Sequence, residues 1–157
     1  MESKVKLSDF LNKELIFTNQ AFSSADSIFE EFYDSALSKG YVTEAFLPKI
    51  KEREKTFPTG IALMDYNVAI PHTDPECIKK EFVAIYTLEE PVKFSRMDDP
   101  TQQVDVDLVF ILGLNQPHTQ LEMLQCLMGV IQDSNLLRNI CQCKNEEILS
   151  LIKNLNY

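Results

Sequence analysis

The 157-residue sequence predicts an α/β fold: a single layered domain over residues 1–157, with helices on both faces of a mixed β-sheet. Two observations lead to this prediction. Short apolar stretches alternate along the chain with longer segments of amphipathic helical pattern. One stretch, 102–114, also changes from alternating polarity to an unbroken apolar run. Such a change is typical of a strand that enters the middle of a sheet covered on both faces.

The first half of the chain contains two expected strands and two expected helices. The helix after the first strand has Ser23 or Ser24 as its N-cap and Gly40 as its stop. The second strand is short and ends at Pro71, which has no backbone N–H to donate. In chain order, we expect a strand over 13–18, helices over 23–39 and 43–54, and a strand over 68–70.

The second half is expected to contain three strands followed by two helices. The sequence Glu-Glu-Pro at 89–91 suggests a bend that separates the first two strands. Apolar residues then recur at helical spacing after the long strand, so a helix should begin near Thr119. We expect strands over 82–88, 92–94 and 102–114, a helix from about 119 to 131, and a helix over 145–155.

Composition excludes several classes of function. A net charge of −9 argues against binding to nucleic acid, which requires clustered Lys and Arg, and against an anionic membrane surface. The four cysteines have no CxxC spacing, which favours free thiols in a reducing cytosol over a zinc site. There is no leader pattern and no apolar run near ~18 residues. We therefore expect a cytoplasmic protein without direct membrane insertion.

The two histidines of the chain, His72 and His118, each follow a proline at the end of an expected strand. Loops that leave the carboxyl ends of strands in open α/β sheets are where ligands usually bind. If the two strands are neighbours, both imidazoles should reach one cleft. Each could instead be an ordinary, satisfied histidine. A zinc site lacks an obvious third ligand, and a hydrolase would need a motif such as G-x-S-x-G that is missing here.

A neutral imidazole has a free lone pair at cellular pH and can hold a phosphoryl group on nitrogen. The transferred group needs hydrogen-bond donors around its charged oxygens. The candidate donors are the guanidinium of Arg53, the hydroxyl of Thr73, and backbone amides of a turn at Thr59 and Gly60. Arg53 could also be an ordinary cation at the end of a helix, beside acidic neighbours.

The stretch 53–74 contains an Arg-Glu pair, a Thr-Gly turn and the sequence Ala-Ile-Pro-His. It strongly resembles the phosphohistidine region of enzyme IIA proteins of the bacterial phosphoenolpyruvate sugar phosphotransferase system. The match is to the fructose–mannitol superfamily and covers most of the chain, including 91–114 and 120–133. Fructose and mannitol types usually carry glycine where this chain has 65–68, so the galactitol-like branch is the most similar.

The resemblance implies a phosphotransferase component with the IIA mannitol/fructose-type fold. His72 matches the phosphorylated histidine, Arg53 the arginine that helps to hold the phosphoryl group, and His118 a supporting histidine. Relatives receive phosphate from the small carrier HPr and pass it to a cysteine of a IIB component. That component serves the membrane permease IIC, which takes up a sugar or polyol. No metal or organic cofactor is implied.

Two other functions remain open at this point. The chain could be a regulatory IIA-like protein whose phosphorylation state controls a target protein rather than transport. It could also be a non-catalytic interaction domain that shares the layered fold. The combination of Arg53, Thr59, Gly60 and His72 argues against the latter, because a pure binding module does not need it.

Overall fold

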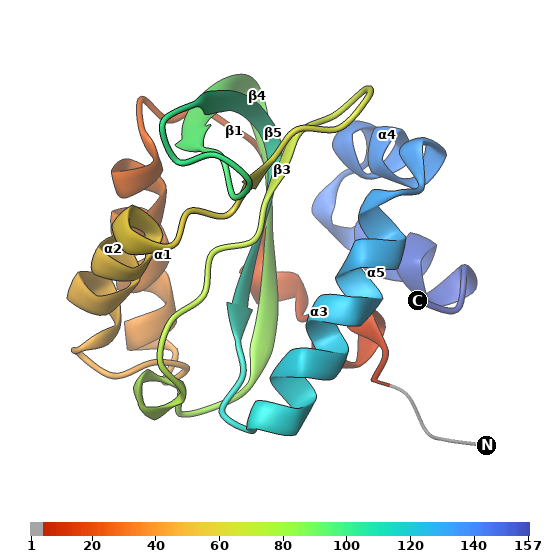
Figure 1. Ribbon diagram of the computed structural model, residues 1–157. Helices are drawn as coiled ribbons and strands as arrows, with labels where there is room; N and C mark the ends of the chain where they lie inside the picture. Colours follow the sequence, from red (N-terminus) through yellow and green to blue (C-terminus); the bar gives the residue numbers. More distant parts are fainter. Residues whose placement is uncertain (1–4) are drawn as a thin grey trace.

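The computed structural model describes residues 5–157 and confirms the expected fold class (Figure 1). One five-stranded mixed sheet has the order β1-β4-β5-β3-β2. Helices α1 and α2 cover one face, and α3, α4 and α5 cover the other. The strands are β1 (Ile16–Gln20), β2 (Gly60–Ile61), β3 (Val68–Ala69), β4 (Phe82–Ser95) and β5 (Gln103–Gly113). The helices are α1 (Ala25–Ser38), α2 (Phe46–Thr56), α3 (Pro117–Ile131), α4 (Ser134–Gln142) and α5 (Asn145–Asn154), with 3₁₀ turns at Leu7–Phe10, Lys13–Leu15 and Pro75–Cys77.

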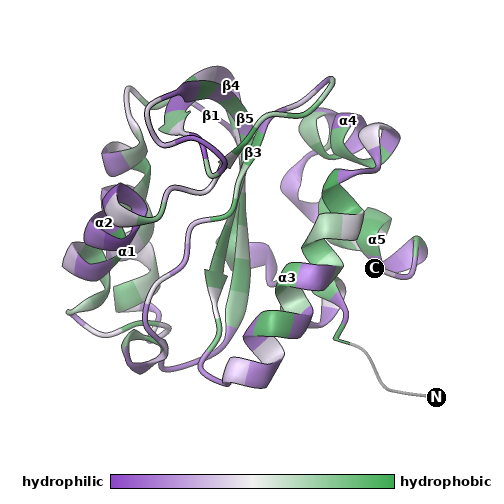
Figure 2. Cartoon of the chain, in the orientation of Figure 1, coloured by the Kyte–Doolittle hydropathy of each residue, from purple (hydrophilic) through white to green (hydrophobic). Residues whose placement is uncertain are grey.

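The core has two parts, one on each face of the sheet. Along β5, Leu108, Phe110 and Leu112 pack toward α3, α4 and α5. Val109 and Ile111, which alternate with them, pack toward α1 and α2. Figure 2 shows the middle of the sheet as largely hydrophobic and the helices on both sides as a mixture of hydrophobic and hydrophilic residues. Coverage of both faces explains why this stretch reads as an unbroken apolar run.

The strands that precede the two histidines are neighbours, which meets the condition for a shared site. β3 pairs with β5 in parallel, with Val68 opposite Leu108 and Ala69 opposite Val109. β1 also pairs in parallel with β4, whereas β4 with β5 and β2 with β3 are antiparallel. The carboxyl ends of β3 and β5 therefore lie at the same edge of the sheet, where loops can converge on one site.

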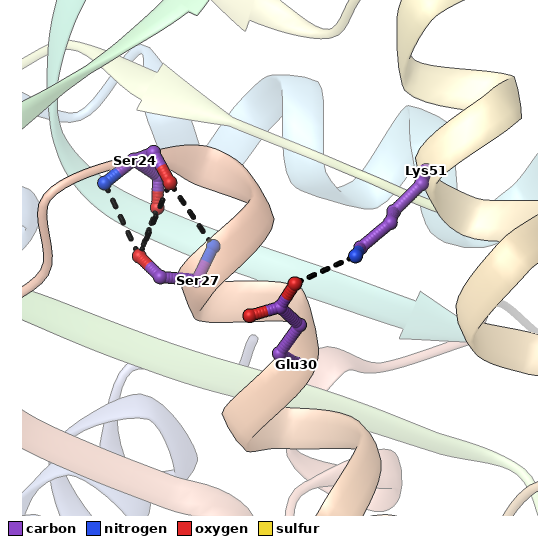
Figure 3. Close-up of polar contacts among 4 residues, drawn as sticks. All are labelled: Ser24, Ser27, Glu30 and Lys51. Carbon is purple, nitrogen blue, oxygen red and sulfur yellow. Dashed lines mark hydrogen bonds and ion pairs between the residues drawn. The ribbon is translucent and has the colours of Figure 1, made fainter.

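Helix α1 begins and ends as its sequence predicts. Ser24 is the N-cap, and its side chain forms a capping box with Ser27 (Figure 3). Gly40 follows the helix with φ of 82°, a left-handed conformation that glycine adopts without steric cost. An ion pair of 2.7 Å between Lys51 and Glu30 then connects α2 to α1. These contacts stabilise the layer that carries the Arg53 end of α2.

Several expected elements differ in extent from the structure, among them the helix expected over 43–54, which is α2 at Phe46–Thr56. The strand predicted over 13–18 begins only at Ile16, because Asn12 accepts a hydrogen bond from the Glu14 backbone and starts a 3₁₀ turn. The strands predicted on either side of the Glu-Glu-Pro sequence form one strand, β4. The expected bend is present as a register shift between Thr87 and Val92 in the pairing with β5.

Two elements of the structure were not expected from the sequence. β2 contains two residues, which pair with β3 through Gly60 opposite Ala69 and Ile61 opposite Val68. α4 is nine residues long and begins after Asp133, whose carboxylate accepts from the Leu136 backbone at 3.1 Å. α3 also starts two residues before the expected position, with Pro117 as its first residue.

Candidate functional site

His72 lies directly beyond the carboxyl end of β3. Pairing with β5 continues past the strand, because the Leu112 amide donates to the Pro71 carbonyl at 2.9 Å. An isolated parallel bridge then joins His72 to Leu112 itself. The histidine is therefore attached to the central part of the sheet although it belongs to a loop. Its side chain is half-buried.

The imidazole of His72 is oriented by its own backbone. Its Nδ1 lies 2.9 Å from the carbonyl oxygen of Ile70, which can only accept, so Nδ1 carries the proton. Nε2 is then the nitrogen with a free lone pair. Burial lowers the pKa of His72, the bond to Ile70 raises it, and the nearby charge of Arg53 lowers it further. These effects together favour the neutral ring, which is the nucleophilic form.

Arg53 lies in the last turn of α2 and is half-buried. Its guanidinium sits 5.0 Å from the centroid of the Phe57 ring, a cation–π arrangement. Within residues 5–157, no carboxylate lies within 4.0 Å of it, so neither Glu52 nor Glu54 pairs with it. The guanidinium therefore keeps donors for an anion near His72, which is more than an ordinary helix-end cation offers.

Thr59, a candidate phosphate ligand, has both of its donors engaged in the structure. Its backbone amide donates to Glu54 Oε2 at 2.8 Å, and its hydroxyl donates to Glu54 Oε1 at 2.9 Å. Its Oγ1 also accepts from the Ile70 amide at 3.2 Å. The expected turn with exposed amides is therefore not observed at Thr59, which is buried. A phosphate-binding role for Thr59 stays a prediction and would require release from Glu54.

Glu54 is the residue near the site that sequence reasoning missed. Burial raises its pKa from the ordinary value of 4.5 to about 7, although the hydrogen bonds from Thr59 act to lower it. One signal in the sequence could have revealed it. Glu54 continues the stripe of buried Phe46 and Ile50 at intervals of four residues, where an apolar side chain would be expected.

Gly60 and Thr73 both lie in tightly packed positions. A Cβ added to Gly60 would lie 2.6 Å from the Ser95 carbonyl oxygen, so only glycine fits beside the end of β4. Gly60 also accepts at its carbonyl from the Met97 amide at 2.8 Å. Thr73 is buried directly after His72. The structure thus gives Gly60 a packing role, and the phosphate-binding roles of both residues remain predictions.

His118 belongs to the first turn of α3, beyond the carboxyl end of β5. Its side chain is 82% exposed, and Nε2 lies 2.7 Å from Glu122 Oε2, one turn further along the same helix. The Gln116 side chain does not cap this helix, which leaves the first amides of α3 available to an anion. The structure brings His72 and His118 to neighbouring strand ends, with the ring of His118 turned to Glu122.

The arrangement suits transfer of an anionic group through a neutral imidazole. It combines an oriented nucleophilic nitrogen at His72, an unpaired guanidinium at Arg53 and a helix N-terminus at the adjacent strand end. Among residues 5–157, no group of three or more His, Cys, Asp or Glu side chains could hold a metal ion. In the same range, no helix has the length and hydrophobicity needed to cross a membrane.

Comparison with known proteins shows the family to which this chain belongs. Residues 9–155 match the family described as "Phosphoenolpyruvate-dependent sugar phosphotransferase system, EIIA 2". The galactitol-specific EIIA component of the Escherichia coli phosphotransferase system (strain K12) is 33% identical over 122 residues. That alignment covers 76% of this chain and 79% of the relative.

Two solved structures illustrate the similarity of the fold. The nitrogen regulatory protein IIA-Ntr from Neisseria meningitidis has a TM-score of 0.77 and 25% identity, over 92% of this chain and 97% of that chain. Enzyme IIA for mannitol from Escherichia coli, in complex with phosphorylated enzyme IIB, has a TM-score of 0.70 and 21% identity. The second match covers 92% of this chain and 97% of that chain.

Proposed function

Because this chain belongs to the EIIA 2 family of the phosphoenolpyruvate-dependent sugar phosphotransferase system, we propose that His72 is its phosphorylated residue. The observation that supports this choice most directly is the bond from Nδ1 to the Ile70 carbonyl, which leaves the Nε2 lone pair free. Residues 1–157 would act as one cytoplasmic EIIA domain. It would receive phosphate from HPr and pass it to a cysteine of a IIB component, which serves a IIC permease.

Each transfer exchanges one bond to phosphorus. The Nε2 lone pair of His72 forms the new N–P bond, while the bond from phosphorus to the donor atom of HPr breaks and the donor keeps that electron pair. In the second transfer, the IIB thiolate attacks the same phosphorus, and the N–P electron pair returns to Nε2. The Nδ1–H stays bonded to Ile70 in both steps, so the ring needs no change of tautomer.

The neighbouring groups would stabilise charge on the phosphoryl oxygens. Arg53 can offer two parallel N–H donors, since no carboxylate in the described part of the chain occupies it. His118 and the first amides of α3 would approach from the adjacent strand end. Thr59, Gly60 and Thr73 are the other proposed ligands, of which Thr59 would first have to leave Glu54.

The substrate of the whole system is a finer question. The galactitol-specific relative, at 33% identity, favours a sugar or polyol of galactitol type. The similarity to a nitrogen regulatory protein supports a second candidate function, in which a target protein distinguishes the phosphorylated chain from the free chain.

The test is reconstitution with phosphoenolpyruvate, enzyme I and HPr, followed by intact mass spectrometry at neutral to alkaline pH. We expect a gain of one acid-labile phosphate, which is lost when the phosphorylated chain is separated from its donors and mixed with an excess of a galactitol-type IIB protein. Phosphate that is retained with every IIB protein tried would favour the regulatory function. A chain that gains no phosphate from any HPr would refute the phosphocarrier proposal.

A further inference from the structure

The stripe of α2 residues that faces the core ends in a carboxylate. Glu54 follows Phe46 and Ile50 on this stripe and accepts both the amide and the hydroxyl of Thr59. In the part of the chain that the structure describes, no Lys, Arg or His nitrogen lies within 4.0 Å of Glu54. A carboxylate withdrawn from water and paired with no cation is costly to maintain. Its position therefore calls for an explanation other than stability.

The contacts of Glu54 lead to the nucleophile in three steps. Thr59 Oγ1, which donates to Glu54, accepts the Ile70 amide at 3.2 Å. The carbonyl of Ile70 accepts Nδ1–H of His72 at 2.9 Å. A single residue, Ile70, thus binds Thr59 through its amide and His72 through its carbonyl. The helix end that carries Arg53 is connected in this way to the imidazole.

The backbone near His72 has little other support on this side. β2 and β3 have two residues each, so their ladder is short. Thr59 lies opposite Ile70, one position beyond the last pair of the β2–β3 ladder. The next residue, Pro71, has no backbone N–H and cannot extend the ladder. The side chains of Glu54 and Thr59 therefore extend the connection between the strands to the residue whose carbonyl orients the ring.

We infer that Glu54 and Thr59 are a positioning pair for His72, which hold the Ile70 carbonyl so that Nδ1 keeps its proton and Nε2 remains the nucleophilic nitrogen. This inference rests on the proposed function of His72 as phosphoryl acceptor. In this role neither residue touches the phosphoryl group, and Thr59 stays bonded to Glu54, so the role is an alternative to direct phosphate binding by Thr59. The side chain of Glu54 is half-buried, and burial raises its pKa to about 7. A protonated carboxyl can still accept the Thr59 amide.

A second link from α2 provides a matched control. Lys49 forms an exposed ion pair of 3.1 Å with Asp74, two residues after His72. This ion pair connects α2 to the part of the loop that follows His72. It is exposed to solvent and does not contact Ile70. Exposed ion pairs of this kind contribute little to the free energy of unfolding. Lys49→Ala should therefore leave the orientation of the imidazole unchanged.

The test is the tautomer of His72, measured by long-range ¹H–¹⁵N NMR on the full chain. Two imidazoles are present, so His118→Gln assigns the His72 signals. We expect the Nδ1–H tautomer in the original protein and in Thr59→Ser, which keeps the hydroxyl. Thr59→Val and Glu54→Ala should give a mixture of tautomers. They should also raise the pKa of His72, because a looser ring is better hydrated, and slow phosphorylation by about 10- to 100-fold.

A merely structural role would produce a different result. If Thr59→Val and Glu54→Ala only lower the melting temperature, while tautomer and pKa of His72 stay unchanged, the inference is wrong. Should Glu54→Ala not fold, the comparison of Thr59→Val with Thr59→Ser decides the question alone. The NMR readout requires no HPr, so a chain that never takes up phosphate would refute the proposed function without affecting this result.

Discussion

His72 and His118 each follow a proline at the end of neighbouring parallel strands, yet their imidazoles lie in different surroundings. The ring of His72 is half-buried and bonded to a backbone carbonyl. The ring of His118 is 82% exposed and paired with Glu122 of its own helix. One nitrogen of His72 is bonded to a backbone carbonyl, whereas His118 pairs with the half-buried carboxylate of Glu122.

The difference arises from what packs over each strand end. The last turn of α2 and its Glu54–Thr59 contacts reach the backbone before His72. Beyond β5 the chain turns directly into α3, so His118 projects from a first helical turn toward solvent. Two histidines at equivalent positions after a strand therefore have different surroundings. A nucleophile needs neighbours that exclude water and fix its orientation, and these come from tertiary contacts.

The largest expected effect comes from His72→Gln. Glutamine keeps some hydrogen bonding but has no nucleophilic nitrogen, so phosphorylation by HPr should be abolished while the fold persists. Phosphate uptake is measured by intact mass at neutral to alkaline pH, with circular dichroism as the control for folding. Label found on His118, or uptake by His72→Gln, would reverse the roles of the two strand ends.

Glu54→Gln tests the burial on the His72 side through the pH dependence of stability. The folded state raises the pKa of Glu54 from 4.5 to about 7, so it binds the proton more tightly than the unfolded chain. Unfolding free energy should therefore fall as pH rises from 4.5 to 7. Glutamine does not titrate, so the variant lacks this loss. Its free energy of unfolding, relative to that of the original protein, should therefore rise by up to about 3 kcal/mol between pH 5 and pH 8.

Urea unfolding at several pH values measures this difference. Both proteins retain His72, whose lowered pKa contributes equally to each curve and cancels. Glu52→Gln, at an exposed position of the same helix, is the control for the loss of a carboxylate from α2. Parallel stability curves for Glu54→Gln and the original protein would mean that the carboxyl is hydrated.

Arg53→Lys should slow phosphoryl transfer about tenfold or more, roughly 1.4 kcal/mol in barrier. Lysine keeps the charge near His72 but cannot offer two parallel donors in one plane. Single-turnover transfer from phosphorylated HPr measures the rate, and thermal unfolding checks the fold. Unchanged kinetics would reduce Arg53 to a helix-end cation that stacks on Phe57.

His118→Gln should have the smallest effect on the first transfer, about threefold or roughly 0.6 kcal/mol in barrier. The exposed pair with Glu122 contributes little to stability, so the fold should be unaffected. The deficit should be larger in onward transfer to a IIB protein, which rapid mixing with labelled chain can measure. A loss as complete as that of His72→Gln would show that the two histidines act as one unit.

The sequence predicted those elements whose signals are local. The apolar run of β5 and the capped start and glycine end of α1 are confirmed. β2 could not be read in this way, because two residues become a strand only through pairing with β3. The start of β1 at Ile16 likewise depends on the turn that Asn12 caps.

The site shows the same distinction. His72 and Arg53 could be proposed together from motif spacing, and the charge of Arg53 lowers the pKa of His72. The contact from Glu54 to Thr59 was missed, since Glu52 and Glu54 look alike in the sequence. Only the fold decides which of these two carboxylates turns inward to meet a buried hydroxyl.

Both margins of the sheet are short or irregular. The two-residue β2 has its Gly60 carbonyl occupied by the Met97 amide. At the other margin, β1 loses regular pairing between Phe17 and Gln20, and Asn19 takes a φ of 56° while its amide donates to Thr87. Short or irregular edges are poor templates for aggregation. They also offer an added strand little regular backbone to pair with, so we expect a protein that docks here to recognise side chains and to leave without breaking a backbone ladder.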